Sequence, residues 1–184
     1  TWNTWTYGGG WVGPTTTPAD EFDGTACVYM GGNDAAGAGL NQIVFGLPNV
    51  PYTVSCDSAV NNWWWPAAEM RLFFLDGNDV ILASSVTNCA AGITAYDVGT
   101  PWSNYTMTAT SPAGTVKVKV EFACPAGHGT IRFDNAVLTA PLVYPTISNV
   151  YPDGSSLMQA TNALSFTAAS TATSIDAIIA RAGG

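Results

Sequence analysis

Charged side chains are scarce in this 184-residue chain, making up 10% of it against about 25% in an average soluble protein. Basic residues are the scarcest, since five Lys and Arg stand against thirteen Asp and Glu, for a formal net charge of −8. The chain therefore lacks the cationic surface that phosphate backbones and acidic membranes require, which argues against nucleic-acid binding. It also lacks an apolar run near 18 residues, the minimum for a membrane-spanning helix.

Groups that commonly carry catalysis are also few. The only histidine, His128, lies in the turn-like stretch 125–129, without a GxSxG serine or an HExxH helix nearby. Of the three glutamates, Glu69 and Glu121 alternate with apolar residues in strand-like runs, so a solvated outer face is expected for both. No convincing helix is present to follow a phosphate-binding loop. We therefore expect a protein without catalytic activity.

Paired cysteine motifs are absent too. Cys27, Cys56, Cys89 and Cys124 are 29, 33 and 35 positions apart, so no CxxC motif builds a zinc or thioredoxin-like site. Two interpretations stay open: buried free thiols in apolar strands, or one or two disulfides in any of three full connectivities. Low charge with abundant Thr and Gly favours export, so we expect an extracellular or cell-surface location.

Glycine and proline, in contrast, are plentiful, with nineteen and eleven copies among many Thr, Val, Ala and Tyr residues. This composition is typical of short strands joined by turns. Alternation is clearest from Val116 to Phe122, where Lys117, Lys119 and Glu121 interrupt the apolar series. The spacing predicts an all-β sandwich or barrel. Strands are expected at about 24–30, 39–46, 50–60, 67–75, 79–87, 103–110, 114–123 and 129–138.

The composition changes near Pro141. Residues 141–145 read as a short stiff linker, because each proline fixes its own φ and extends the preceding residue. The sequence therefore predicts a first domain at 1–140 and a separate β segment at 146–184. With 39 residues, that segment is too short to bury a core of its own. It is either the start of a second β-sandwich module or a segment that completes its fold on another surface.

Aromatic residues offer the clearest functional signal. Trp63, Trp64 and Trp65 follow two asparagines and precede a strand-like run. Successive residues of an extended chain face opposite ways, so at least one indole is expected to face solvent or a ligand. An exposed ring beside amides and hydroxyls suits stacking on the apolar face of a sugar. The alternative is that Trp63 and Trp65 close one end of the sandwich.

A series of short stretches carries a family resemblance: 24–30, 39–44, 52–55, 69–76, 102–106 and 131–138, the last of which includes the closing strand IRFDNAVL. Read in order, they resemble carbohydrate-binding modules of families 4 and 9, which are jelly-roll β-sandwiches with a galactose-binding-like fold. The resemblance covers residues 1–140 and departs at the start, where the family's Asn-Gly-x-Phe-Glu-like strand is not found in this sequence. The tail from Pro145 resembles the entry to an immunoglobulin-like module of a large exported bacterial protein.

The resemblance implies a non-catalytic module that holds a glycan, with a structural calcium ion. Its calcium ligands would be Asp134 of the closing strand, joined by Asp23 and Glu21, and such hard oxygen ligands suit this ion. The expected glycan-binding residues are Trp63, Trp64, Trp65, Tyr29 and Trp11.

The low number of bases favours a neutral oligosaccharide or polysaccharide as the partner. The alternative is a structural subunit of an extracellular fibre, sheath or surface layer. In that case residues 145–184 would add a strand to a neighbouring copy of the chain.

Overall fold

The computed structural model describes a β-sandwich followed by a small β segment. It describes residues 1–15, 22, 26–32, 37–60, 68–90, 101–125, 130–141, 147–151 and 165–168. The chain divides into two compact units, Thr1–Pro141 and Leu142–Gly184. No helix in these described ranges is long and apolar enough to span a membrane.

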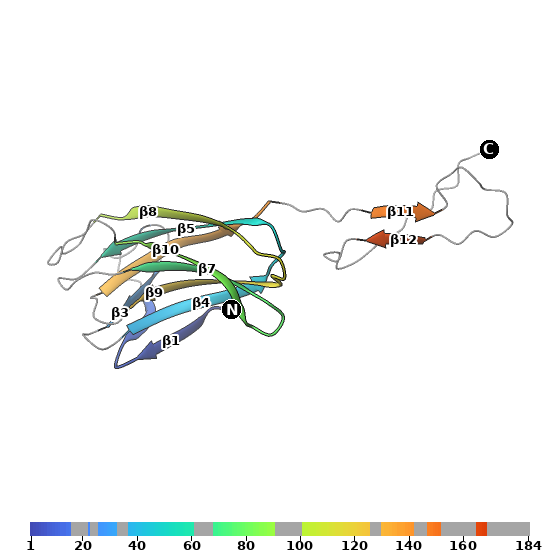
Figure 1. Ribbon diagram of the computed structural model, residues 1–184. Coiled ribbons are helices and arrows are strands. Elements are labelled where there is room, and N and C mark those ends of the chain that lie inside the picture. The colour runs from blue at the N-terminus through green and yellow to red at the C-terminus, as the bar shows by residue number, and fades with distance from the viewer. Residues whose placement is uncertain are drawn as a thin grey trace. The chain divides into compact units, whose positions relative to one another are not determined.

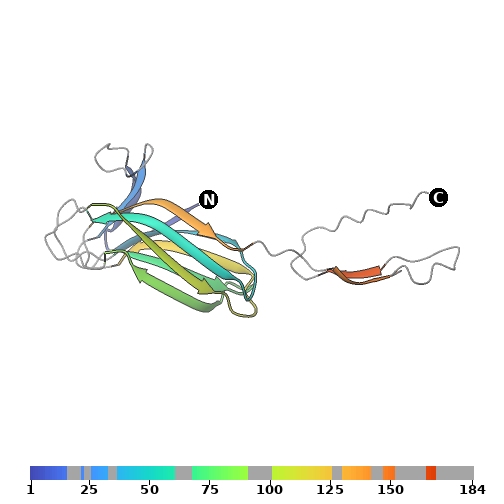
Figure 2. The same ribbon diagram turned by 90° about the horizontal axis from the view of Figure 1, so that it is seen from above.

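The first unit consists of two antiparallel five-stranded sheets stacked face to face, as Figure 1 and, from above, Figure 2 show. We call them the β9 sheet and the β10 sheet. The β9 sheet has the order β1 (Asn3–Tyr7), β4 (Gly37–Phe45), β9 (Lys117–Cys124), β6 (Glu69–Leu75) and β7 (Ile81–Asn88). The β10 sheet has the order β2 (Trp11–Thr15), β3 (Cys27–Gly31), β10 (Thr130–Thr139), β5 (Pro51–Val60) and β8 (Ser103–Thr110). The predicted all-β jelly-roll fold is thus confirmed.

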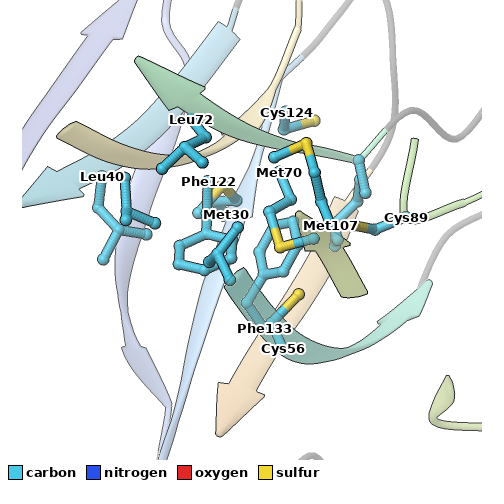
Figure 3. Close-up of a cluster of buried hydrophobic side chains, with 14 of the residues drawn as sticks. Met30, Leu40, Cys56, Met70, Leu72, Cys89, Met107, Phe122, Cys124 and Phe133 are labelled. Atoms are coloured by element: carbon cyan, nitrogen blue, oxygen red, sulfur yellow. The ribbon is translucent and has the colours of Figure 1, made fainter. Parts of the chain in front are cut away.

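The core lies between the two sheets, where alternate residues of each strand meet. Phe122 of β9 and Phe133 of β10 pack with their ring centroids 5.0 Å apart across this layer. Figure 3 shows them among sulfur-containing side chains from both sheets. Since alternate residues of a strand face opposite ways, the residues flanking Phe122 lie on the outer face of the β9 sheet, and Arg132, next to Phe133, lies on the outer face of the β10 sheet.

Two strands at the N-terminus were not expected from the sequence. Each of the eight expected runs overlaps an observed strand, but β1 and β2 lie in the Gly-rich opening, where no strand was expected. β1 is held by β4 and β2 by β3, so pairing with distant strands decides their conformation. The turn between them contains Gly8 and Gly9, both at positive φ, which glycine adopts without a steric penalty.

All four cysteines are buried and free. The sequence left open whether the cysteines are buried free thiols or form disulfides, and in the structure they are buried free thiols. Burial raises the pKa of Cys124 to about 12. A hydrogen bond with Cys89, followed by burial, raises the pKa of Cys56 as well.

The second unit contains β11 (Ile147–Tyr151) and β12 (Ser165–Ala168), which pair as an antiparallel two-stranded sheet. The register shifts between Ser148 and Tyr151, which marks an irregularity in this short ladder.

Candidate functional site

The candidate site lies on the outer face of the β9 sheet, where edge strand β1 carries two aromatic side chains. Trp5 stands opposite Gly39 of β4 in the antiparallel ladder. Tyr7 stands opposite Gly37 in the same ladder. The two rings are parallel within 7°, with centroids 5.8 Å apart. We call Trp5 and Tyr7 the aromatic pair.

The two glycines of β4 make room for the aromatic pair. A Cβ atom at Gly39 would lie 2.6 Å from the Trp5 ring, and one at Gly37 would lie 2.8 Å from the Tyr7 ring. Real Cβ atoms essentially never approach other heavy atoms that closely, so any larger residue would displace the rings. The Gly-Ala-Gly stretch at the start of β4 therefore seats both rings on the sheet, with Trp5 half-buried and Tyr7 48% exposed.

Beside the aromatic pair lies the carboxylate of Glu121 on β9. Its Oε2 accepts a hydrogen bond from the indole Nε1 of Trp5 at 3.3 Å and one from Nζ of Lys119 at 3.4 Å. Its Oε1 accepts a hydrogen bond from Nη1 of Arg71 at 2.8 Å. Only 7% of the Glu121 side chain is exposed. The expected solvated position of this glutamate is wrong, because Trp5, Lys119 and Arg71 surround a carboxylate that does face outward.

Arg71 extends this network to β6. Its Nε donates to Oε2 of Glu69 at 2.6 Å, so one guanidinium bridges two carboxylates. Burial would lower the pKa of Arg71, but hydrogen bonds and charge attraction from Glu121 and Glu69 outweigh it, and the pKa is raised. Lys119 also lies over the ring of Phe73, 4.1 Å from its centroid. These interactions hold the polar side chains in defined positions next to the aromatic pair.

The charges of this network cancel. Two carboxylates, of Glu69 and Glu121, face two cations, of Arg71 and Lys119, through short contacts. Asn41 stands opposite Glu121 in the ladder between β4 and β9, and adds an uncharged amide beside the network. The site thus combines fixed aromatic rings with hydrogen-bonding groups and has no excess of either charge.

Two of the predicted glycan-binding aromatics lie on the other sheet. Tyr29 stands opposite Arg132 on the outer side of the β10 sheet, and Trp11 lies on its edge strand β2. The guanidinium of Arg132 is 5.5 Å from the ring centroid of Trp102, and Arg132 is 4% exposed. Tyr29 and Trp11 therefore do not join the aromatic pair on the β9 sheet. The predicted residues Trp63, Trp64 and Trp65, and His128, lie outside the described residues.

The predicted calcium ligand Asp134 faces another carboxylate. It stands opposite Asp57 in the ladder between β10 and β5. Both oxygens of Asp57 accept hydrogen bonds from side-chain amides, from Asn104 and from Asn135, each at 3.1 Å. These oxygen donors are of the type that calcium prefers. In the part of the chain that the structure describes, no three His, Cys, Asp or Glu side chains converge as metal ligands.

Asp23 and Glu21, the other two predicted calcium ligands, lie outside the described residues. The calcium site therefore stays a prediction. Asp134 and Asp57 fit it as a pair of oxygen-bearing side chains on adjacent strands.

The aromatic pair and its partner Glu121 were not predicted from the sequence. The signal was present as alternation in Asn3–Tyr7, where Trp5 and Tyr7 are two apart, and in the two glycines of β4. Neither signal indicates by itself that β1 pairs with β4, because the two strands are separated by some thirty residues. The pairing places the rings over the glycines.

Comparison with known proteins supports the fold. No family model matches the sequence, and no curated protein matches it. Among solved structures, the enzymatically active domain of tailspike protein 4 from bacteriophage CBA120 matches with a TM-score of 0.59 and 16% identity. That match covers 76% of this chain and 19% of the tailspike chain.

Two carbohydrate-binding modules match over most of their own length. A family 16 module has a TM-score of 0.50 and 17% identity, covering 66% of this chain and 82% of that one. TmCBM61, solved in complex with β-1,4-galactotriose, has a TM-score of 0.50 and 13% identity, covering 76% of this chain and 88% of that one. At these identities the comparisons establish a shared β-sandwich fold. Residues 1–141 therefore have the fold of carbohydrate-binding modules.

Proposed function

We propose that the chain is a non-catalytic module that binds a neutral glycan on the outer face of the β9 sheet and acts outside the cell. The observation that carries this proposal is the aromatic pair, held parallel over two glycines and bordered by a bonded polar network. Aromatic rings stack on the apolar faces of sugar rings, while carboxylates accept hydrogen bonds from hydroxyls and amides both accept and donate them.

The fixed geometry of the aromatic pair favours binding. Trp5 is held by the hydrogen bond to Glu121 and by its seat over Gly39, so little rotational freedom remains to be lost when a ligand arrives. Ordering side chains on binding otherwise costs about 0.5–1.5 kcal/mol each. Tyr7, at 48% exposed, offers an accessible ring beside it.

The charge balance supports a neutral ligand. Glu69, Arg71, Lys119 and Glu121 satisfy one another, so neither cation is left to attract a sulfate or uronate group. The net charge of −8 adds a general repulsion of polyanions. A ligand rich in hydroxyls, without charged groups, matches this surface.

Affinity electrophoresis of the full chain in gels containing neutral polysaccharides, followed by calorimetry with oligosaccharides, tests the proposal. We expect retention by at least one neutral polymer, dissociation constants between micromolar and millimolar, and no retention by a polyuronate. Changing Trp5→Ala or Tyr7→Ala should weaken binding about tenfold, corresponding to roughly 1.4 kcal/mol.

Phe45→Ala is the matched control. Phe45 is an aromatic residue at the other end of β4 and is 95% exposed, so its removal changes an exposed ring without touching the aromatic pair. Retention that survives Trp5→Ala and Tyr7→Ala but is lost in Trp63→Ala, Trp64→Ala or Trp65→Ala would move the site to the predicted tryptophan triplet. Absence of retention on every polymer would overturn glycan binding altogether.

A second candidate function is assembly into an extracellular fibre, sheath or surface layer. The observation that favours it is the edge strand β7, which contains no charged residue and no proline. Its Ile81 and Val86 are 53% and 55% exposed. Natural sheets commonly protect such edges with charges or prolines, because an open edge can pair with another chain. Residues 145–184 of a neighbouring copy would supply the added strand.

Sedimentation velocity of the full chain at increasing concentration tests assembly. If β7 is the docking edge, Val86→Lys should reduce the assembled fraction, because a lysine on an edge strand opposes pairing. Lys117→Arg, on the same sheet, keeps its charge and is the control. A chain that stays monomeric at all concentrations excludes this second function and leaves glycan binding unaffected.

A further inference from the structure

A cleft lies on the inner side of β1, opposite the aromatic pair. A cleft of about 340 Å³ opens between the two sheets, near their edge strands β1 and β2. Ordinary cores contain few voids larger than a water molecule, whereas ligand pockets begin near 300 Å³. The size of this cleft is therefore that of a small-molecule site rather than a packing defect.

The wall of the cleft is aromatic and apolar. Phe122 and Phe133, which Figure 3 shows facing each other in the core, form its floor. Trp2 packs on Phe122 with ring centroids 6.0 Å apart and is 40% exposed, so it lies between the floor and solvent. Val12 and Val28 add aliphatic surface from the β10 sheet. Such a lining favours carbon-rich ligands and offers few partners to the hydroxyls of a sugar.

The cleft is bordered by an irregularity in β10, which contributes its polar lining residues. The register between β10 and β5 shifts between Asp134 and Val137, so Asn135 and Ala136 have no partner in that ladder. Asn135 has a φ of 48°, in the left-handed region, and its side-chain amide donates to Asp57. Bulges of this kind re-aim groups next to binding sites. Asp134, Asn135 and Ala136 all line the cleft.

We propose that this cleft binds a small, mostly apolar molecule, aromatic or alicyclic, that carries one hydrogen-bond donor. The ring system lies against Phe122, Phe133 and Trp2, and the donor points to the oxygen atoms at the bulge, where Asp134 lines the cleft. The inference is independent of glycan binding, because the cleft and the aromatic pair lie on opposite sides of β1.

The neutral fluorescent probe N-phenyl-1-naphthylamine tests the site in the full chain, since it is aromatic and has a single N–H donor. We expect saturable binding with one probe per chain and enhanced fluorescence. Two variants fill the cleft from different sides: Ala136→Phe at the exposed bulge and Val28→Phe on β3. Each should weaken probe binding at least tenfold while thermal unfolding remains cooperative.

Ala140→Phe is the matched control, because it adds the same ring to an exposed position after β10 and away from the cleft lining. Trp5→Ala should leave probe binding unchanged even where it abolishes glycan retention, which separates the two sites. The proposal is overturned if the wild-type chain binds no probe. It is equally overturned if both filling variants bind the probe as tightly as Ala140→Phe, or if several probes bind without saturation.

Discussion

The indole N–H of Trp5 donates a hydrogen bond across 3.3 Å to the carboxylate of Glu121, although the two residues are 116 positions apart in the chain. The bond joins edge strand β1 to central strand β9 over the intervening strand β4. Because Glu121 also binds Arg71, the aromatic pair is connected to the interior of the sheet. A change at Glu121 is therefore expected to act on both stability and ligand binding.

Replacing Glu121→Ala should lower the free energy of unfolding by about 2 kcal/mol, since it deprives partly buried donors of their acceptor. Glu69→Ala is the matched control, and we expect it to cost less than about 1 kcal/mol. The Glu69 side chain is 29% exposed, against 7% for Glu121. Urea unfolding followed by circular dichroism measures both. Equal losses of unfolding free energy in the two variants would show that Glu121 is not the centre of the network.

Replacing Gly39→Ala should displace the Trp5 ring, because the new Cβ would lie 2.6 Å from it. Overpacking of this kind typically costs about 1–3 kcal/mol. Gly13→Ala is the control, since a Cβ at Gly13 meets nothing within 4 Å. Near-ultraviolet circular dichroism and glycan retention should change in the first variant and remain constant in the second. If both variants bind the glycan as the parent chain does, Trp5 does not form part of the site.

Alkaline pH should destabilise the fold through Cys124. Burial raises the pKa of this thiol from 9.0 to about 12, so the folded state disfavours the thiolate. This contribution to stability is complete below pH 9 and is lost as the pH rises toward 12. The loss is about 1.4 kcal/mol per pH unit within that window. The melting temperature of Cys124→Ala should accordingly fall less steeply than that of the parent chain between pH 9 and 11. If the melting temperatures of the variant and the parent chain fall in parallel with pH, the loss of stability does not come from Cys124.

Calcium should stabilise the sandwich if Asp134 is a ligand, as the family resemblance implies. Millimolar Ca²⁺ added after chelator treatment should then raise the melting temperature, by roughly 2–4 °C for each kcal/mol of binding. Asp134→Asn should remove most of that rise. Asp79→Asn is the control, because Asp79 lies in an exposed turn, paired with Lys117. A melting temperature that is the same with chelator and with calcium would rule out the site.

The strands with strong apolar patterns were predictable, because the alternation of apolar and polar residues along each of them is visible in the sequence. β5 and β10 each contain several consecutive buried residues, and both lie near their expected positions. β1 was not predicted, since most of its residues are exposed and the sequence does not indicate that it pairs with β4. Edge strands bury little surface of their own, so distant partners decide whether they form.

By itself, the sequence determined the fold class. Alternating apolar residues make one face of each strand apolar, which favours stacked sheets. The low number of bases, five among 184 residues, argued against a polyanionic ligand. Only the tertiary structure decided which aromatic side chains lie side by side. Trp5 and Glu121 meet because β1, β4 and β9 lie side by side, and that order is fixed by nonlocal pairing. Composition and spacing report what each strand can bury, but the contacts that build a site depend on which strands become neighbours.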